Sequence, residues 1–191
     1  MKKNFLKTAT ILTLVMFITG CANSSAKPSS TTTEAKALGT KTVYIRSDKA
    51  SYSANSRIAQ NIKDECKIDR TLIKYIQEVA TQNGMRVVVK NDLSPDDVEL
   101  KVEITDAISA GNAFIGHRKF VAIAGGLTKG GQSLGTFEAA RRTGGGMFAG
   151  FKGSCAVLGR AVKALAQDTV KWMKNPKDKA MLGDVRLIPK H

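Results

Sequence analysis

The segment VELKVEIT, residues 98–105, alternates apolar and polar side chains without a break. Period-two alternation predicts a β-strand whose two faces meet different surroundings. The apolar positions, Val98 to Ile104, are expected to lie on a core. Glu99, Lys101 and Glu103 form the other face and are expected to lie in water. The protein should therefore contain a sheet that is covered on one side only.

Four more strands are predicted around this one. Residues 117–127 and 133–142 form two of them, and the turn between them contains Gly130-Gly131, which accepts the positive φ angles of a two-residue hairpin loop. Residues 41–47 and 85–89 form the other two, because both stretches are rich in β-branched side chains.

Two amphipathic helices are predicted to cover the sheet. Apolar residues recur at mostly helical spacing from Ile58 to Ala80, and Asn83-Gly84 is a typical helix stop. A second apolar stripe runs from Cys155 to Trp172 and ends at Asn175-Pro176. The element order β-α-β-β-β-β-α predicts an α+β domain over residues 41–176. Its single sheet should be mostly antiparallel, with about five strands and both helices on one face. Residues 177–191 are expected to be a loosely ordered basic tail.

The first 21 residues resemble a bacterial lipoprotein signal. Lys2, Lys3 and Lys7 precede an apolar run that is too short to span a bilayer, and Ile18-Thr19-Gly20-Cys21 resembles a lipobox. The resemblance implies removal of residues 1–20 and lipidation of Cys21. Ala22 resembles the outer-membrane sorting pattern, which implies a periplasm-facing protein on the outer membrane. The alternative is an ordinary signal peptide that happens to end near a cysteine.

The composition of residues 21–40 predicts a flexible tether, because Ser, Thr, Ala and Lys cannot bury enough apolar surface to order it. The whole chain has 30 basic and 16 acidic side chains, a net charge of +14. Such a charge attracts polyanions, of which anionic lipid and glycan are the candidates outside the cytoplasm. Nucleic acid is not expected as a partner of an exported protein. The alternative is a solvated basic surface without a dedicated ligand.

Cys66 and Cys155 remain after Cys21 is lipidated. An even pair in an oxidising compartment tends to form a disulfide, and each cysteine lies on a predicted helix, near its start. Two separate buried thiols are the alternative. A thioredoxin-like redox role has no support, because the chain has no CxxC motif.

The residues that could carry catalysis are few. His117 is the only histidine within the domain, and neither a nucleophilic triad nor a set of metal ligands surrounds it in the sequence. We therefore expect no catalytic residues, no metal and no cofactor.

A glycine-rich segment, residues 143–153, joins the last predicted strand to the second helix. A helix N-terminus presents free N–H groups to anions, and neighbouring cations would strengthen such a site. The candidate anion-binding residues are Arg141, Arg142, Lys152, Gly153 and Ser154. The alternative is a tight connection whose glycines serve packing.

Two further segments, residues 111–119 and 149–155, together with the lipobox resemble a group of small bacterial lipoproteins. The element order also resembles α/β lipoproteins that serve as accessory subunits of envelope transport and assembly machines. These resemblances imply a non-enzymatic outer-membrane lipoprotein, an accessory or binding module with an envelope protein as partner. The alternatives are a direct binder of anionic lipid or glycan and a small hydrolase.

Overall fold

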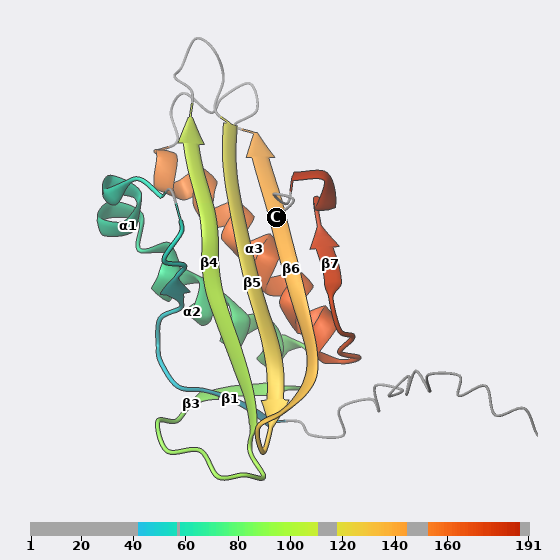
Figure 1. The fold of residues 1–191 in the computed structure, drawn as a ribbon. Helices are drawn as coiled ribbons and strands as arrows, with labels where there is room; N and C mark the ends of the chain where they lie inside the picture. Colours follow the sequence, from blue (N-terminus) through green and yellow to red (C-terminus); the bar gives the residue numbers. More distant parts are fainter. Residues whose placement is uncertain (1–41, 57, 111–117, 145–152, 188–191) are drawn as a thin grey trace, which may run out of the picture. The chain divides into compact units, whose positions relative to one another are not determined.

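Seven strands form one mixed sheet in the computed structural model, which describes residues 42–56, 58–110, 118–144 and 153–187 (Figure 1). The strands are β1 (Thr42–Ile45), β2 (Ser51–Tyr52), β3 (Arg86–Val89), β4 (Val98–Ala110), β5 (Arg118–Lys129), β6 (Gln132–Gly144) and β7 (Ala180–Gly183). The helices are α1 (Gln60–Cys66), α2 (Ile68–Gln82) and α3 (Ser154–Met173), followed by the short 3-10 helix η2 (Val185–Leu187).

The expectation of a mostly antiparallel sheet is wrong. The strand order is β3-β1-β4-β5-β6-β7, with β2 paired to β4 as well. Only the β4–β5 and β5–β6 pairs are antiparallel, and the other four pairs are parallel. The reason is that helices connect β1 to β3 and β6 to β7. A helical crossover carries the chain back to the end of the sheet at which the preceding strand began, so the strands on either side of it run parallel.

The five expected strands are all present, and two short ones join them. β2 has two residues and β7 has four, too few to show an alternating pattern. β7 lies within the segment expected to be a loose tail. It is held there by β6, since Thr136 Oγ1 donates to Asp178 at 2.5 Å and accepts from the Lys179 N–H at 2.9 Å.

The helical pattern from Ile58 to Ala80 contains two helices instead of one. Lys67 has φ +43°, a left-handed conformation that ends α1 and redirects the chain into α2. The predicted stop at Gly84 is confirmed, because this residue has φ +73° directly after α2. The predicted hairpin is confirmed too, with φ +55° at Gly130 and +81° at Gly131.

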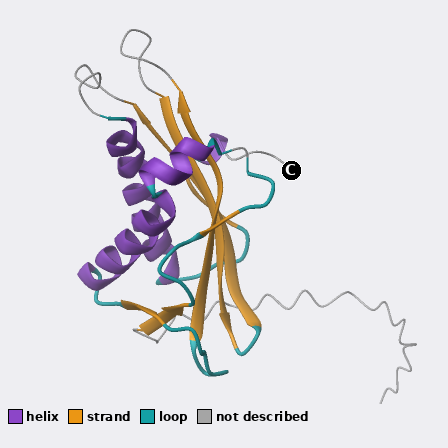
Figure 2. Ribbon diagram, turned by 90° about the vertical axis from the view of Figure 1, so that its left-hand side faces the viewer, coloured by secondary structure: helices purple, strands orange, loops and turns teal. Residues whose placement is uncertain are grey.

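Helices α2 and α3 pack on one face of the sheet, and no α-helix of the described residues covers the other face (Figure 2). They run parallel, since the Cys66–Cys155 bond joins them near their N-terminal ends and Lys174 Nζ donates to Asn83 Oδ1 at their C-terminal ends. The apolar positions of β4 lie in the core, where Leu100 and Ile104 are at most 1% exposed. Glu99 departs from the expectation of a wet face, because it is buried.

The disulfide between Cys66 and Cys155 is present, with the two Cα atoms 4.9 Å apart. Cys155 is the second residue of α3, as the sequence predicted. Cys66 is instead the last residue of α1, because the helix break at Lys67 follows it at once. The bond thus joins the α1–α2 junction to the start of α3. Within the described residues, no helix is long and apolar enough to cross a membrane.

Candidate functional site

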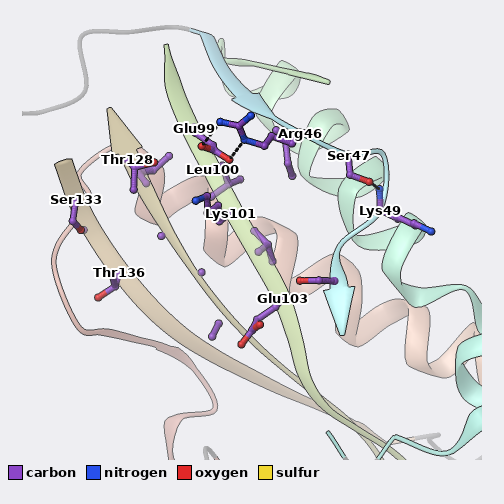
Figure 3. Close-up of a pocket in the computed structure, with 18 residues that line it drawn as sticks. Arg46, Ser47, Lys49, Glu99, Leu100, Lys101, Glu103, Thr128, Ser133 and Thr136 are labelled. Atoms are coloured by element: carbon purple, nitrogen blue, oxygen red, sulfur yellow. Dashed lines mark hydrogen bonds and ion pairs between the residues drawn. The ribbon is translucent and has the colours of Figure 1, made fainter. Parts of the chain in front are cut away.

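The helix-free face of the sheet carries a trough of about 580 Å³ (Figure 3). The trough runs from the β1–β2 connection across β4 and β5 to β6. The floor of the trough is low because small residues of β5 lie in its middle. Gly126 of β5 is paired with Lys101 of β4 on one side and with Thr136 of β6 on the other. In the next pair on this face, Glu103 of β4 lies opposite the small Ala124 of β5. Small side chains between longer ones make a groove in an otherwise flat sheet.

A half-buried ion pair borders one end of the trough. Arg46 Nε donates to Glu99 Oε1 at 2.8 Å, and its Nη1 donates to the Asn91 carbonyl at 3.0 Å. The Glu99 side chain is only 10% exposed, whereas that of Arg46 is 54% exposed. The carboxylate is therefore held in place while the guanidinium keeps a solvent-facing side. This arrangement explains why Glu99 is buried on a face that the sequence predicted to be wet.

The remaining polar groups of the trough could contact a partner that carries both positive and negative charges. Lys101 and Glu103 follow each other on the same face of β4, and neither forms an ion pair within the described part of the chain. Hydroxyl groups line the trough on several elements, namely those of Ser47, Ser51, Thr128, Ser133 and Thr136. Hydroxyls both donate and accept hydrogen bonds, so they accommodate varied partner groups.

On the other face of the sheet, a lysine is buried between two serines. Lys119 is 1% exposed, and its Nζ donates to Ser109 Oγ at 2.5 Å and to Ser154 Oγ at 3.1 Å. Burial lowers the pKa of Lys119 below its usual value of 10.5. Lys119 was not among the predicted site residues, although the sequence contains a signal for its burial. Lys119 is in phase with Val121 and Ile123, so strand alternation places it on the core face.

We expect Lys119→Met to change the pH dependence of stability. A lowered pKa in the folded state means that the unfolded chain binds more protons, so this lysine contributes a stability that rises with pH up to about 10.5. Below the folded-state pKa, Lys119 is charged in both states, and the folded state bears the full free-energy penalty of burying that charge. The unfolding free energy of the wild type should therefore increase relative to that of the variant as the pH is raised from the folded-state pKa of Lys119 toward 10.5. Denaturant titrations at several pH values check this, and two parallel curves would contradict it.

Four of the five predicted anion-binding residues are described, Arg141, Arg142, Gly153 and Ser154, and the structure does not bring these four together. Arg141 and Arg142 are adjacent in β6, so their side chains point to opposite faces of the sheet. Arg141 lies on the helix side, where its Nε and Nη2 donate to the Asp168 carboxylate at 2.7 and 2.8 Å. This hydrogen bonding raises the pKa of Arg141. Arg142 is exposed on the other side, and its backbone N–H donates to Asp184 at 2.8 Å.

The other predicted residues are placed as follows. Gly153 precedes the first turn of α3, and Ser154 begins that helix and accepts the hydrogen bond from Lys119. Cys21, His117 and Lys152 lie outside the described residues. Among the residues that are described, no group of three or more His, Cys, Asp or Glu side chains could hold a metal ion.

No protein-family model matches this chain, and no curated protein sequence matches it. Several solved structures are similar to it at low sequence identity. A minor lipoprotein from Acinetobacter baumannii is 13% identical with a TM-score of 0.43, and the match covers 70% of this chain and 90% of that one. The PelC dodecamer from Paraburkholderia phytofirmans is 10% identical with a TM-score of 0.44, over 69% and 91% of the two chains. A DUF330 protein from Xanthomonas campestris is 12% identical with a TM-score of 0.40, over 68% and 93%. Similarity at this level assigns neither a family nor an activity to the chain.

Proposed function

We propose that this protein is a lipid-anchored binding module that faces the periplasm from the outer membrane and has no catalytic activity of its own. The observation that carries the proposal is the trough of about 580 Å³ on the sheet face that no helix covers. A sheet face that carries a groove with unpaired charges and hydroxyls is suited to hold another molecule. The lipobox at residues 18–21 supplies the argument for the anchor.

The lining of the trough favours a protein partner. Lys101 and Glu103 offer one charge of each sign about two residues apart, which complements a polypeptide better than a polyanion. The Arg46–Glu99 pair borders one end of the trough, where two hydrogen bonds hold the Glu99 carboxylate. We therefore propose an accessory role in envelope assembly or transport, in which the trough binds a segment of an envelope protein.

Direct binding of anionic lipid or glycan is the second candidate for function. The glycine-rich connection has limited support for this role, since the Arg141 guanidinium is engaged by Asp168. Any anion-binding role must therefore rest on cations elsewhere on the surface. A small hydrolase has the least support. Lys119 and the two serines that it contacts lie on the core side of the sheet, whereas the trough that could hold a substrate lies on the opposite side.

We expect Cys21→Ala to release the protein from membranes or to leave an unprocessed precursor. Cysteine is the acceptor of the lipid, so its loss removes both the anchor and the signal for cleavage. Cell fractionation and the mass of the N-terminal peptide measure the outcome. Unchanged fractionation with an unchanged peptide mass would contradict the anchor.

A photocrosslinking side chain at position 133 should capture an envelope protein in intact cells. Ser133 is exposed on β6, lines the trough and forms no side-chain hydrogen bond within the described residues. Thr81, exposed on α2 in the helix layer, is the matched control. We expect a discrete crosslinked product from position 133 that is weaker or absent from position 81. Equal products from both positions, or none from position 133, would contradict the trough as the binding site.

A further inference from the structure

The outward face of α3 carries a continuous row of cations. Arg160, Lys163, Lys171 and Lys174 are all exposed and follow one another at helical spacing, with the neutral Gln167 in the middle. This set is called the α3 basic stripe. From its first to its last residue it extends about 21 Å along the helix axis.

No acidic side chain of α3 neutralises the stripe. The only acidic residue of this helix is Asp168, which points to the sheet and binds Arg141. None of the four stripe residues forms an ion pair with another described residue. Lys174 Nζ donates to the neutral Asn83, and Lys163 lies over the Tyr75 ring at 5.9 Å from its centroid. Each of the four charges is therefore available to an external anion.

Helix α2 extends the charged surface beside the stripe. It lies in the same layer as α3, on the same face of the sheet (Figure 2). Its exposed Arg70 and Lys74 add two cations, with side chains 64% and 74% exposed, and Arg70 lies 4.0 Å from the exposed Asp48. Glu78 is the one acidic residue of α2 that is exposed, and it lies 3.9 Å from Lys74. Over α2 and α3, the outer surface thus carries more exposed cations than exposed anions.

We propose that the α3 basic stripe docks the domain onto the surface of an anionic phospholipid bilayer. Charge complementarity is the first argument, because each cation near such a surface contributes a favourable increment that does not depend on a shaped pocket. The anchor is the second argument, and here the inference rests on the proposed function. A chain running from Cys21 to Thr42 spans at most about 70 Å, so a lipidated protein always remains near the bilayer. At such a high effective concentration, a weak contact suffices.

This docking explains how the two faces of the sheet are used. The stripe lies on the outside of the helix layer, and the trough lies on the opposite face of the sheet. A domain that rests on the membrane through α3 therefore turns its trough toward the periplasm. The same orientation would keep the trough accessible to its protein partner.

The test uses the mature, lipidated protein on vesicles whose headgroups carry a nitroxide quencher. A fluorophore is attached without reduction to Gln167→Cys, within the stripe, or to Ser133→Cys, in the trough. On phosphatidylglycerol-rich vesicles we expect quenching at position 167 and little at position 133. On phosphatidylcholine vesicles, or in high salt, we expect the difference to disappear.

Charge variants show whether the stripe itself is responsible. Each neutralised stripe residue should lower the ratio of docked to free domain about fivefold, so that changing all four to Gln abolishes the quenching at position 167. The matched control removes four exposed cations that lie outside both the stripe and the trough, in Arg86→Gln, Lys129→Gln, Lys177→Gln and Arg186→Gln. It should retain most of the quenching.

Three outcomes would overturn the proposal. Equal quenching at positions 167 and 133 would show that the domain has no preferred orientation. An equal loss in both charge variants would show an effect of net charge alone. Binding of a soluble polyanionic glycan by the stripe, without quenching on anionic vesicles, would assign the surface to a polymer instead. A protein that fails to associate with any vesicle would contradict the lipid anchor of the proposed function, which is a separate result.

Discussion

Replacement of both bridge cysteines, in Cys66→Ala/Cys155→Ala, should lower the free energy of unfolding by about 4 to 5 kcal/mol. The bond closes a loop with a sequence separation of 89 residues, and a cross-link over so long a loop removes much of the conformational freedom of the unfolded chain. For a domain of this size the melting temperature should fall by on the order of 15 °C.

The structure gives a second reason to expect a large effect. The bond ties the α1–α2 junction to the start of α3, where α2 and α3 begin side by side. At their other ends only the Lys174–Asn83 hydrogen bond was found between polar side chains of the two helices, among the residues that the structure describes. Reduction of the wild type should reproduce the loss seen in the double variant. Labelling of both thiols in the unfolded, unreduced wild type would contradict the disulfide.

Substitution of Gly125 by Val should cost roughly 3 kcal/mol or more of unfolding free energy. Gly125 lies on the core side of β5, directly opposite Phe137 of β6. A Cβ atom at this position would lie 2.6 Å from the Lys101 carbonyl oxygen and 2.8 Å from two carbons of the Phe137 ring. The carbonyl belongs to the neighbouring strand and cannot rotate away.

The Phe137 ring has little room to move either. It is 2% exposed and packs against Trp172 of α3, with 4.6 Å between the ring centroids. The Trp172 indole is itself fixed, since its Nε1 donates to the Lys177 carbonyl at 3.1 Å. The strain of an added side chain would therefore reach β4, β6 and α3 together. This is why we expect a loss well above that of an ordinary surface substitution.

Gly159→Ala is the matched control for this experiment. Gly159 lies within α3, and an added Cβ would meet no atom within 4 Å. Because Ala favours a helix interior over Gly by about 1 kcal/mol, this variant should be more stable than the wild type. Thermal melts of both variants give the comparison. A Gly125→Val variant as stable as the wild type would show that β5 can shift away from β4 at no cost.

Local patterns predicted most of the elements. The alternation over residues 98–105 placed the core face of β4, the helical stripe from Cys155 to Trp172 placed α3, and Gly130-Gly131 placed the hairpin turn. The parallel pairs could also have been predicted, since the order β-α-β carries that information. The burial of Lys119 could have been predicted from the alternation of β5, which places this residue on the same face as Val121 and Ile123. The two serines that accept hydrogen bonds from its ammonium could not be identified from that strand alone.

The sequence by itself determined the longer strands and helices, which side of each faces the core, and that a cysteine pair was available to bond. These properties depend on spacing within one segment, where backbone geometry relates neighbouring residues directly. The tertiary structure alone decided the rest: the trough across three strands, the pairing of Arg141 with Asp168 and the addition of β7. Each of these depends on which distant segment packs against a given face, and no pattern within either segment records that choice.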